Sequence, residues 1–179
     1  MSQLAIYHEA DPGTPLETTD DPLQIAAALA PIGVRFERWP VQDCAADDAL
    51  GVYAEEITRL KKSGGYQSVD VIAIAPDHPD RAALRQKFLS EHRHAEDEVR
   101  FFVEGEGLFT LHEDGRVFNL LCTRGDLIAV PANMRHWFDM GAEPRFTAIR
   151  LFVNPDGWVA HMTGDAIADR FPRFEKGAA

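Results

Sequence analysis

Residues 88–112 read FLSEHRHAEDEVRFFVEGEGLFTLH, and this stretch decides the fold. Near its start lie His92, His94 and Glu98, which all occupy even positions. Successive side chains of a β-strand point to opposite faces, so an extended chain places the two imidazoles on one face. Glu98 joins them there if residues 95–97 stay roughly extended. Two imidazoles and a carboxylate that converge in this way suit a divalent transition metal.

A second segment, residues 125–136, reads GDLIAVPANMRH and supplies one more candidate ligand. A Gly-Asp turn leads into an apolar strand, Pro131 and Asn133 predict a turn, and His136 returns on a new strand. Three imidazole nitrogens and one carboxylate suit Fe, Ni, Mn, Co, Cu or Zn, whereas Ca and Mg prefer oxygen ligands. Four ligands leave two positions open on an octahedral ion, and a closed structural zinc site is the competing interpretation.

Beyond Glu91 the sequence consists of short apolar runs separated by turn residues. Asp114 and Gly115 lie between two such runs, which is the signal of a β-hairpin. Strands at such short intervals are typical of a β-sandwich or a β-barrel. The expected strands are 98–104, 108–112, 116–122, 127–130, 135–139 and 146–152.

The N-terminal half has a mixed α and β pattern and carries no catalytic motif. Its expected strands and helices are strands 4–7, 34–39 and 68–75 and helices 21–30, 47–62 and 80–87. No stretch has the composition of a linker, so we expect a single domain over residues 1–179. Its expected parts are a mixed α/β part that packs on the barrel (1–87), a metal-binding β-barrel core (88–155) and a C-terminal tail (156–179).

Composition narrows the choice of partners and of compartment. The formal net charge of −11 argues against a nucleic-acid or anionic-membrane surface, which needs clustered Lys and Arg. No apolar run approaches the ~20 residues of a membrane span, and the first residues are too polar for a signal peptide. Cys44 and Cys122 do not form a disulfide framework. We therefore expect a cytoplasmic protein, and we expect a monomer because no long apolar stripe is left outside the core.

Arg100 shares the parity of Glu98, so a regular strand turns it inward beside the metal. A buried arginine needs a carboxylate or a bound anion as its partner. Its purely structural role would be an ion pair with Asp97, Glu96 or another acid. Four aromatic side chains are candidates for the apolar wall of a substrate pocket, although phenylalanines more often belong to the core: Phe88, Phe101, Phe138 and Trp158.

Both segments resemble the two sequence motifs of the cupin superfamily. The first is His-x-His, three residues, Glu, six residues, Gly, here His92 to Gly105; the second is Gly125, Pro131 and His136. The resemblance implies a mainly β protein with flanking α-helices, built on the cupin-type double-stranded β-helix (jelly-roll) barrel. Gln86 and Asn133 stand where cupins often have glycine, and Asn tolerates the left-handed backbone that such a turn can need.

A narrower likeness runs through the same segments. Residues 91–101 (EHRHAEDEVRF), 103–109 (VEGEGLF), 125–138 (GDLIAVPANMRHWF) and the run from 150 to 158 are similar to the acireductone dioxygenase family. Gln86 and Asn133 agree with that family's pattern. The resemblance covers nearly the whole chain and is weakest in the first 80 residues.

The resemblance implies an enzyme of methionine salvage that cleaves 1,2-dihydroxy-5-(methylthio)pent-1-en-3-one with O₂. With Fe²⁺ the products would be formate and 4-methylthio-2-oxobutanoate; with Ni²⁺ they would be formate, CO and 3-methylthiopropanoate. One ion per chain would be held by His92, His94, Glu98 and His136, and Arg100 would hold or polarise the substrate oxygens. Both ions accept this donor set, so the ligands do not choose between them.

Two other functions are compatible with the same residues. One is a different metal-dependent cupin enzyme, either a dioxygenase of other enols or an isomerase. The other is a non-catalytic cupin that binds a metal or ligand without turnover. Oxygen uptake with acireductone as the substrate would distinguish an acireductone dioxygenase from both of these alternatives.

Overall fold

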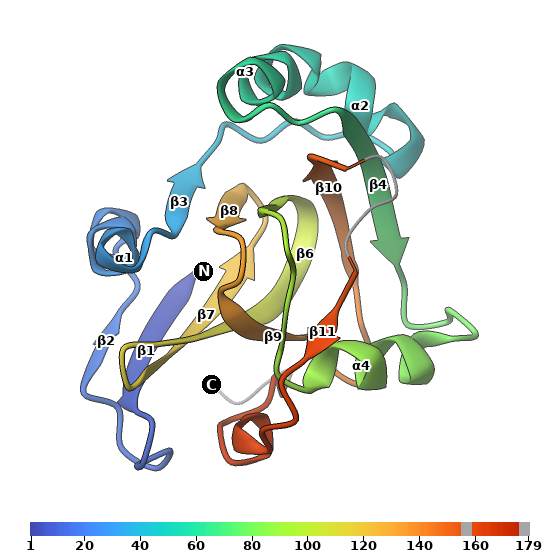
Figure 1. Ribbon diagram of the computed structural model, residues 1–179. Helices are drawn as coiled ribbons and strands as arrows, with labels where there is room; N and C mark the ends of the chain where they lie inside the picture. The colour runs from blue at the N-terminus through green and yellow to red at the C-terminus, as the bar shows by residue number, and fades with distance from the viewer. Residues whose placement is uncertain (155–158, 176–179) are drawn as a thin grey trace.

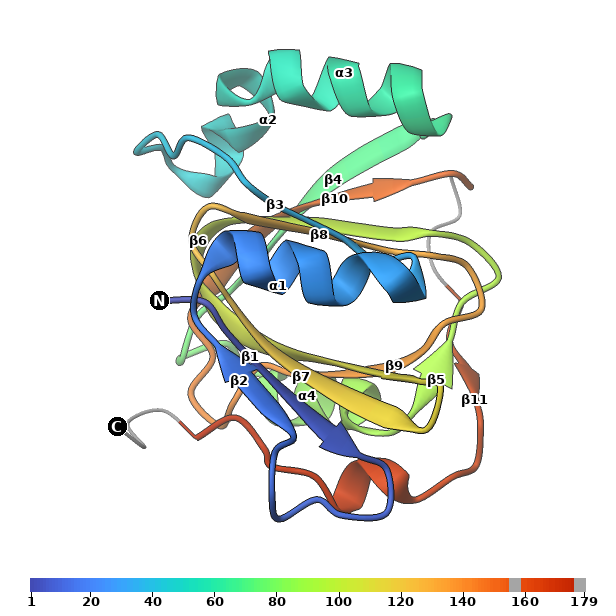
Figure 2. The same cartoon turned by 90° about the vertical axis from the view of Figure 1, so that its left-hand side faces the viewer.

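Two antiparallel β-sheets face each other in the computed structural model, which describes residues 1–154 and 159–175 (Figures 1 and 2). The first sheet contains, in order, β2 (Glu17–Thr19), β1 (Gln3–His8), β7 (Arg116–Thr123), β6 (Glu98–Glu113), β9 (Arg135–Asp139), β5 (His92–Arg93) and β11 (His161–Met162). The second sheet is formed by β3 (Arg35–Arg38), β8 (Asp126–Val130), β6, β10 (Phe146–Phe152) and β4 (Ser68–Ile74). The expected mainly β fold with flanking helices is confirmed.

Strand β6 belongs to both sheets because it bends at Gly105. Its first part pairs with β8 and β10, and its second part pairs with β7 and β9. Gly105 has φ +75°, and a Cβ atom there would overlap the carbonyl oxygen of Arg145. The sequence predicted two strands here, 98–104 and 108–112. The glycines between them bend one continuous strand and do not end it.

Helices cover the edges and one outer face of the sheets. α1 (Pro22–Leu29) lies beside β3, and the short helix α2 (Ala49–Val52) and α3 (Ala54–Gly64) lie over β4 and β10 (Figures 1 and 2). α4 (Arg81–Leu89) lies against β9 and leads into β5. Among the described residues, no helix is both long enough and apolar enough to cross a membrane.

Of the helices expected in the N-terminal half, the first begins where the sequence predicted, and the second is divided in two. Asp21 caps α1 as expected, since its side chain accepts a hydrogen bond from Leu23 N at 2.8 Å. The single helix expected at 47–62 is instead interrupted at Tyr53. The Tyr53 ring is fully buried against Phe101, and its hydroxyl accepts a hydrogen bond from Gln42 N at 2.9 Å. The break between α2 and α3 therefore lies at the residue whose side chain packs against Phe101.

Alternation along the strands divides the buried side chains into three groups. Between the sheets lies an aromatic interior that includes Phe102, Phe109 and Phe138. A second group, with Phe101, fills the space between the second sheet and α2 and α3. A third lies on the outer face of the first sheet, where Trp137 packs against the C-terminal residues Ile167 and Phe171.

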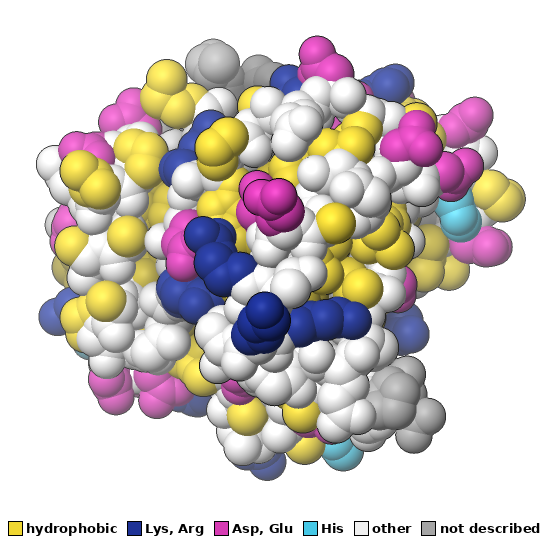
Figure 3. All heavy atoms as spheres, turned by 90° about the horizontal axis from the view of Figure 1, so that it is seen from above, with side chains coloured by type: hydrophobic (Ala, Val, Ile, Leu, Met, Phe, Trp, Pro, Cys, Tyr) yellow, Lys and Arg dark blue, Asp and Glu magenta, His cyan; other side chains and the backbone are white. Residues whose placement is uncertain are grey.

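The face seen from above, over α2 and α3, carries charges of both signs. Acidic and basic side chains lie among hydrophobic ones on this face (Figure 3). The net negative charge of the chain is therefore not gathered there as a field of one sign.

Candidate metal centre

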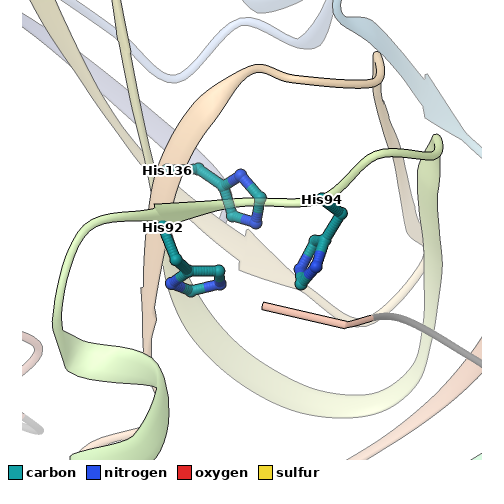
Figure 4. A group of neighbouring side chains, drawn as sticks. All are labelled: His92, His94 and His136. Atoms are coloured by element: carbon teal, nitrogen blue, oxygen red, sulfur yellow. The ribbon is translucent and has the colours of Figure 1, made fainter. Parts of the chain in front are cut away.

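The four predicted ligands meet at the end of the barrel where β5, β6 and β9 come together. His92 lies on β5 opposite His136 on β9, His94 follows β5 directly, and Glu98 begins β6. All four side chains are buried. The three imidazoles point toward one another (Figure 4), and one ring nitrogen from each lies within 4.8 Å of the other two.

Each imidazole is oriented by the main chain. His92 Nδ1 lies 2.8 Å from Ser90 O, His94 Nδ1 lies 2.9 Å from Val159 O, and His136 Nδ1 lies 2.9 Å from Met134 O. A carbonyl oxygen only accepts, so each Nδ1 carries the proton and donates it. In a neutral ring, which is the form that binds a metal, this arrangement leaves the Nε2 lone pair for a ligand role.

Glu98 stands among these nitrogens. Its Oε2 lies 3.1 Å from His94 Nε2 and 3.2 Å from His136 Nε2, and its Oε1 lies 2.6 Å from Arg100 Nε. Burial alone would raise the pKa of Glu98. The Arg100 guanidinium outweighs this effect and holds the pKa of Glu98 well below the usual range. The group is therefore an ionised carboxylate.

These residues fit a divalent transition metal. Neighbouring donors on one octahedral ion with bonds of about 2.1 Å are about 3 Å apart, which matches the carboxylate–imidazole separations. Burial, with His136 close by, lowers the pKa of His92 to about 4, so this ring is neutral at pH 7 as a metal ligand must be. A cation at the centre would offset the repulsion between the lone pairs that converge there.

The segment between His94 and Glu98 is bent, although the sequence argument required it to be roughly extended. Two carboxylates that accept main-chain N–H groups accompany the bend. Asp97 Oδ1 accepts from Ala132 N at 3.0 Å, and Glu96 Oε2 accepts from Asn154 N at 3.1 Å. Both acids therefore act on the loop that carries the ligands, and Glu98 still reaches the cluster.

Arg100 lies inside the barrel, as its parity predicted. It is 4% exposed, and its guanidinium carbon lies 4.7 Å from the centre of the Phe138 ring and 5.5 Å from that of Phe109. It forms an ion pair with Glu98, whereas the structural role expected from the sequence was a pair with Asp97, Glu96 or another acid. The arginine thus holds a positive charge next to the ligand carboxylate and between two aromatic faces.

The four candidate pocket residues have different locations. Phe138 lies beside Arg100, and Phe88 on α4 packs against the interior group at partial burial. The prediction for Phe101 is wrong, because its ring packs outside the barrel against Trp39 and Tyr53 at 4.7 and 4.8 Å. Trp158 lies outside the described residues.

Sequence reasoning missed several contributors to the site. Phe109 packs on the His136 ring, with 5.8 Å between the ring centres. Leu111 is paired with His136 across β6 and β9, and Phe109 lies two residues before Leu111, so alternation along β6 turns both side chains inward. This alternation was the signal that could have identified Phe109. The carbonyl of Val159, which orients His94, left no signal, because any residue type offers a carbonyl.

Comparison with known proteins identifies the family of this chain. Residues 3–160 match the model of the ARD/ARD′ family. An acireductone dioxygenase from Synechococcus is 58% identical over 178 residues, covering 96% of this chain and 98% of its own. The chain belongs to the acireductone dioxygenase family. An acireductone dioxygenase from Pseudomonas aeruginosa is 56% identical over 180 residues, which cover 98% of this chain and 99% of its own.

A solved acireductone dioxygenase from Bacillus anthracis, with a cadmium ion in its active centre, shares the fold. It superposes with a TM-score of 0.78 at 32% identity and covers 90% of this chain and 98% of its own. Acireductone dioxygenases are cupins, so the expected cupin barrel is confirmed together with the family. The chain is thus a metal-dependent enzyme of the dioxygenase class.

Proposed function

We propose that this enzyme cleaves 1,2-dihydroxy-5-(methylthio)pent-1-en-3-one with O₂, as a step of methionine salvage. One divalent ion per chain is held by His92, His94, Glu98 and His136. The observation that carries the proposal is the cluster of three imidazoles with protonated Nδ1 atoms around the ionised Glu98 carboxylate. The relatives named acireductone dioxygenase supply the substrate class.

The proposed ion is Fe²⁺ or Ni²⁺, and the products depend on which one is bound. Iron gives formate and 4-methylthio-2-oxobutanoate, whereas nickel gives formate, CO and 3-methylthiopropanoate. When bound, the ion supplies positive charge to a chelating enediolate and the electronic coupling that its reaction with dioxygen requires. Three neutral donors and one carboxylate leave the site with about one positive charge, which favours an anionic chelating substrate.

Arg100 orients the substrate oxygens in this proposal. Its guanidinium is fixed by Glu98 and by the rings of Phe109 and Phe138, so its charge is in place before the substrate arrives. Preorganised charge of this kind stabilises an oxyanion without reorganisation during the reaction. The aromatic interior around Phe138 excludes water from the reacting atoms and strengthens these interactions.

The test is anaerobic loading of the purified protein with Fe²⁺ or Ni²⁺, followed by acireductone and O₂. Keto acid from the iron form, or CO from the nickel form, would support the proposal and assign a route to each metal. Metal bound at about one ion per chain with neither product would retain the metal site and rule out the substrate.

Two further proposals concern the protein in the cell. We propose that it works as a cytoplasmic monomer. Cys44 and Cys122 are both free thiols, which suits a reducing compartment that also keeps iron ferrous. The large exposed apolar residues include Leu16 and Leu23 near the start of the chain and Val159 and Met162 near its end. Sedimentation at micromolar concentration would reveal a dimer if one forms.

A further inference from the structure

His112 lies behind the metal centre, on the outer face of the first sheet, between two carboxylates. Its Nδ1 lies 2.6 Å from Glu91 Oε2, and its Nε2 lies 3.0 Å from Glu9 Oε2. His112 is 2% exposed and Glu91 is 1% exposed. Carboxylate oxygens accept hydrogen bonds, so the ring donates from both nitrogens; the bond to Glu91, more than the one to Glu9, raises its pKa.

Glu91 also binds the C-terminal segment. Its Oε1 accepts a hydrogen bond from Thr163 Oγ1 at 2.8 Å, and its main-chain oxygen accepts one from Thr163 N at 3.2 Å. Thr163 directly follows β11, which pairs with β5. A single buried carboxylate thus joins β6, the residue before β5 and the segment after β11.

The strand that carries His92 and leads into His94 has few main-chain restraints. β5 contains only His92 and Arg93, and it forms the single pair His92↔His136 with β9 and two pairs with β11. α4 ends at Leu89, two residues before Glu91. Because a short ladder fixes a strand weakly, the side-chain bonds of Glu91 supply the restraint that main-chain pairing does not.

The same C-terminal segment reaches the second ligand of this loop. Val159, four residues before Thr163, accepts a hydrogen bond from His94 Nδ1 at its main-chain oxygen. Glu91 holds this segment at Thr163, and β11 lies between the two contacts. Displacement of Thr163 from Glu91 would therefore move both the main chain next to His92 and the carbonyl that orients His94.

We infer that Glu91, His112 and Thr163 are positioning residues for the metal: together they hold His92 and His94 in the geometry that binds the ion. This inference rests on the ligand roles given under Proposed function. None of the three side chains is a ligand, since Glu91 turns away from His92 toward His112. Groups that orient ligand histidines change metal affinity about 10–100-fold when they are removed.

The experiment measures the Kd for Co²⁺ by competition with a chelator, the visible spectrum of the Co²⁺ form, and thermal unfolding of the metal-free protein. Thr163→Val removes one hydroxyl from an exposed residue and is the mild variant. His112→Leu removes the donor to Glu91, whereas His112→Asn keeps an N–H near the position of Nδ1. Asp126→Asn is the matched control, because Asp126 is a fully buried carboxylate bound by Ser2, Thr123 and Arg38.

We expect Thr163→Val to weaken Co²⁺ binding about 10-fold and His112→Leu up to about 100-fold, each with a shifted Co²⁺ spectrum. His112→Asn should recover most of the affinity. Asp126→Asn should lower the unfolding temperature and leave both the Kd and the spectrum unchanged.

Two results would overturn the inference: one shows that the network is only structural, and the other shows that the proposed ligand set is wrong. A wild-type Kd and spectrum in Thr163→Val and in any folded His112→Leu protein, with only the unfolding temperature changed, would make the network merely structural. Wild-type Co²⁺ affinity in His94→Ala would instead show that the proposed ligand set is wrong, and the inference would fail with it. Thr163→Val alone decides the matter if His112→Leu does not fold.

Discussion

His94 turns its Nε2 toward Glu98 and the other two imidazoles, and its Nδ1 donates a hydrogen bond to the C-terminal segment. We predict that His94→Ala loses metal and activity together, because a donor atom is removed from the ion. Elemental analysis and oxygen uptake measure the two losses. His78→Ala is the control, since His78 Nδ1 accepts the N–H of Asp80 in a turn outside the cluster. Full metal occupancy in His94→Ala would show that His94 is not a ligand.

Arg100 is predicted to act on the substrate and not on the ion. Arg100→Ala should retain metal and lower kcat by about 100-fold or more, the cost of removing a preorganised donor from an oxyanion site. Arg100→Lys keeps a charge beside Glu98 but loses the planar fork, so we expect only partial recovery. Metal content and steady-state kinetics on the same samples separate the two effects. Unchanged kinetics in Arg100→Ala would leave the residue a structural partner of Glu98.

Parity explains which single residues could be predicted from the sequence. It correctly related His92 to His94 and, along β6, Glu98 to Arg100, whereas the bend between His94 and Glu98 lies outside the rule. The same rule places Phe101 on the opposite side, with Val99 and Val103, so its choice as a pocket residue contradicted the available signal. Residue type favoured an aromatic wall, whereas the position on the strand decides which aromatic side chain can form it.

At the scale of the element, the bend in β6 is the feature that brings Glu98 and the β9 histidine together. We predict that Gly105→Ala costs about 2 kcal/mol or more of unfolding free energy, because a methyl group would meet Arg145 O at positive φ. Gly115→Ala has a similar φ of +70° but open space around it, so it should cost only about 1 kcal/mol. Urea unfolding of both variants gives the comparison. Equal costs would mean that backbone strain alone matters at Gly105.

Elements with a local signal were predicted better than those that depend on partners. The Asp114-Gly115 hairpin has both residues at positive φ, as its sequence indicated. The two-residue strands β5 and β11 had no such signal, because they exist through their pairing with β9 and with each other. The Glu91–His112 contact joins the residue before β5 to a residue of β6, 21 positions apart, and no spacing rule reveals it.

For the whole molecule, Asp139 ties α4, β9 and the C-terminal residues together. It accepts hydrogen bonds from Arg85 Nε at 2.7 Å, from Gly141 N at 2.8 Å and from Phe174 N at 3.0 Å. Burial acts to raise the pKa of Asp139, but these bonds, with that of Arg85 first among them, hold it below its usual value.

A folded-state pKa below the unfolded value stabilises the protein above the unfolded pKa, which is about 3.9 for Asp. We therefore predict that this stabilisation is fully present near neutral pH and is lost as the pH falls through the folded pKa. Asp139→Asn should flatten the dependence of the unfolding free energy on pH below about pH 4. Denaturant unfolding at several pH values measures this slope, and an unchanged slope would contradict the assignment.

The N-terminal part and the barrel share their sheets. β1 pairs with β7, β3 pairs with β8, and β4 pairs with β10. We propose that residues 1–179 therefore form the single domain expected from the sequence and unfold in one cooperative transition. Far-ultraviolet circular dichroism and tryptophan fluorescence should give coincident melting curves. Two separated transitions would make residues 1–87 an independent unit.

The hydrogen bond from His94 to the carbonyl of Val159 also has a consequence for biosynthesis. A ribosome synthesises His92, His94 and Glu98 first, His136 later, and Val159 after all of them. A nascent chain that stops at His136 carries every proposed ligand atom but lacks the carbonyl that orients His94. Selection of the ion in the geometry that we propose therefore requires translation at least as far as Val159.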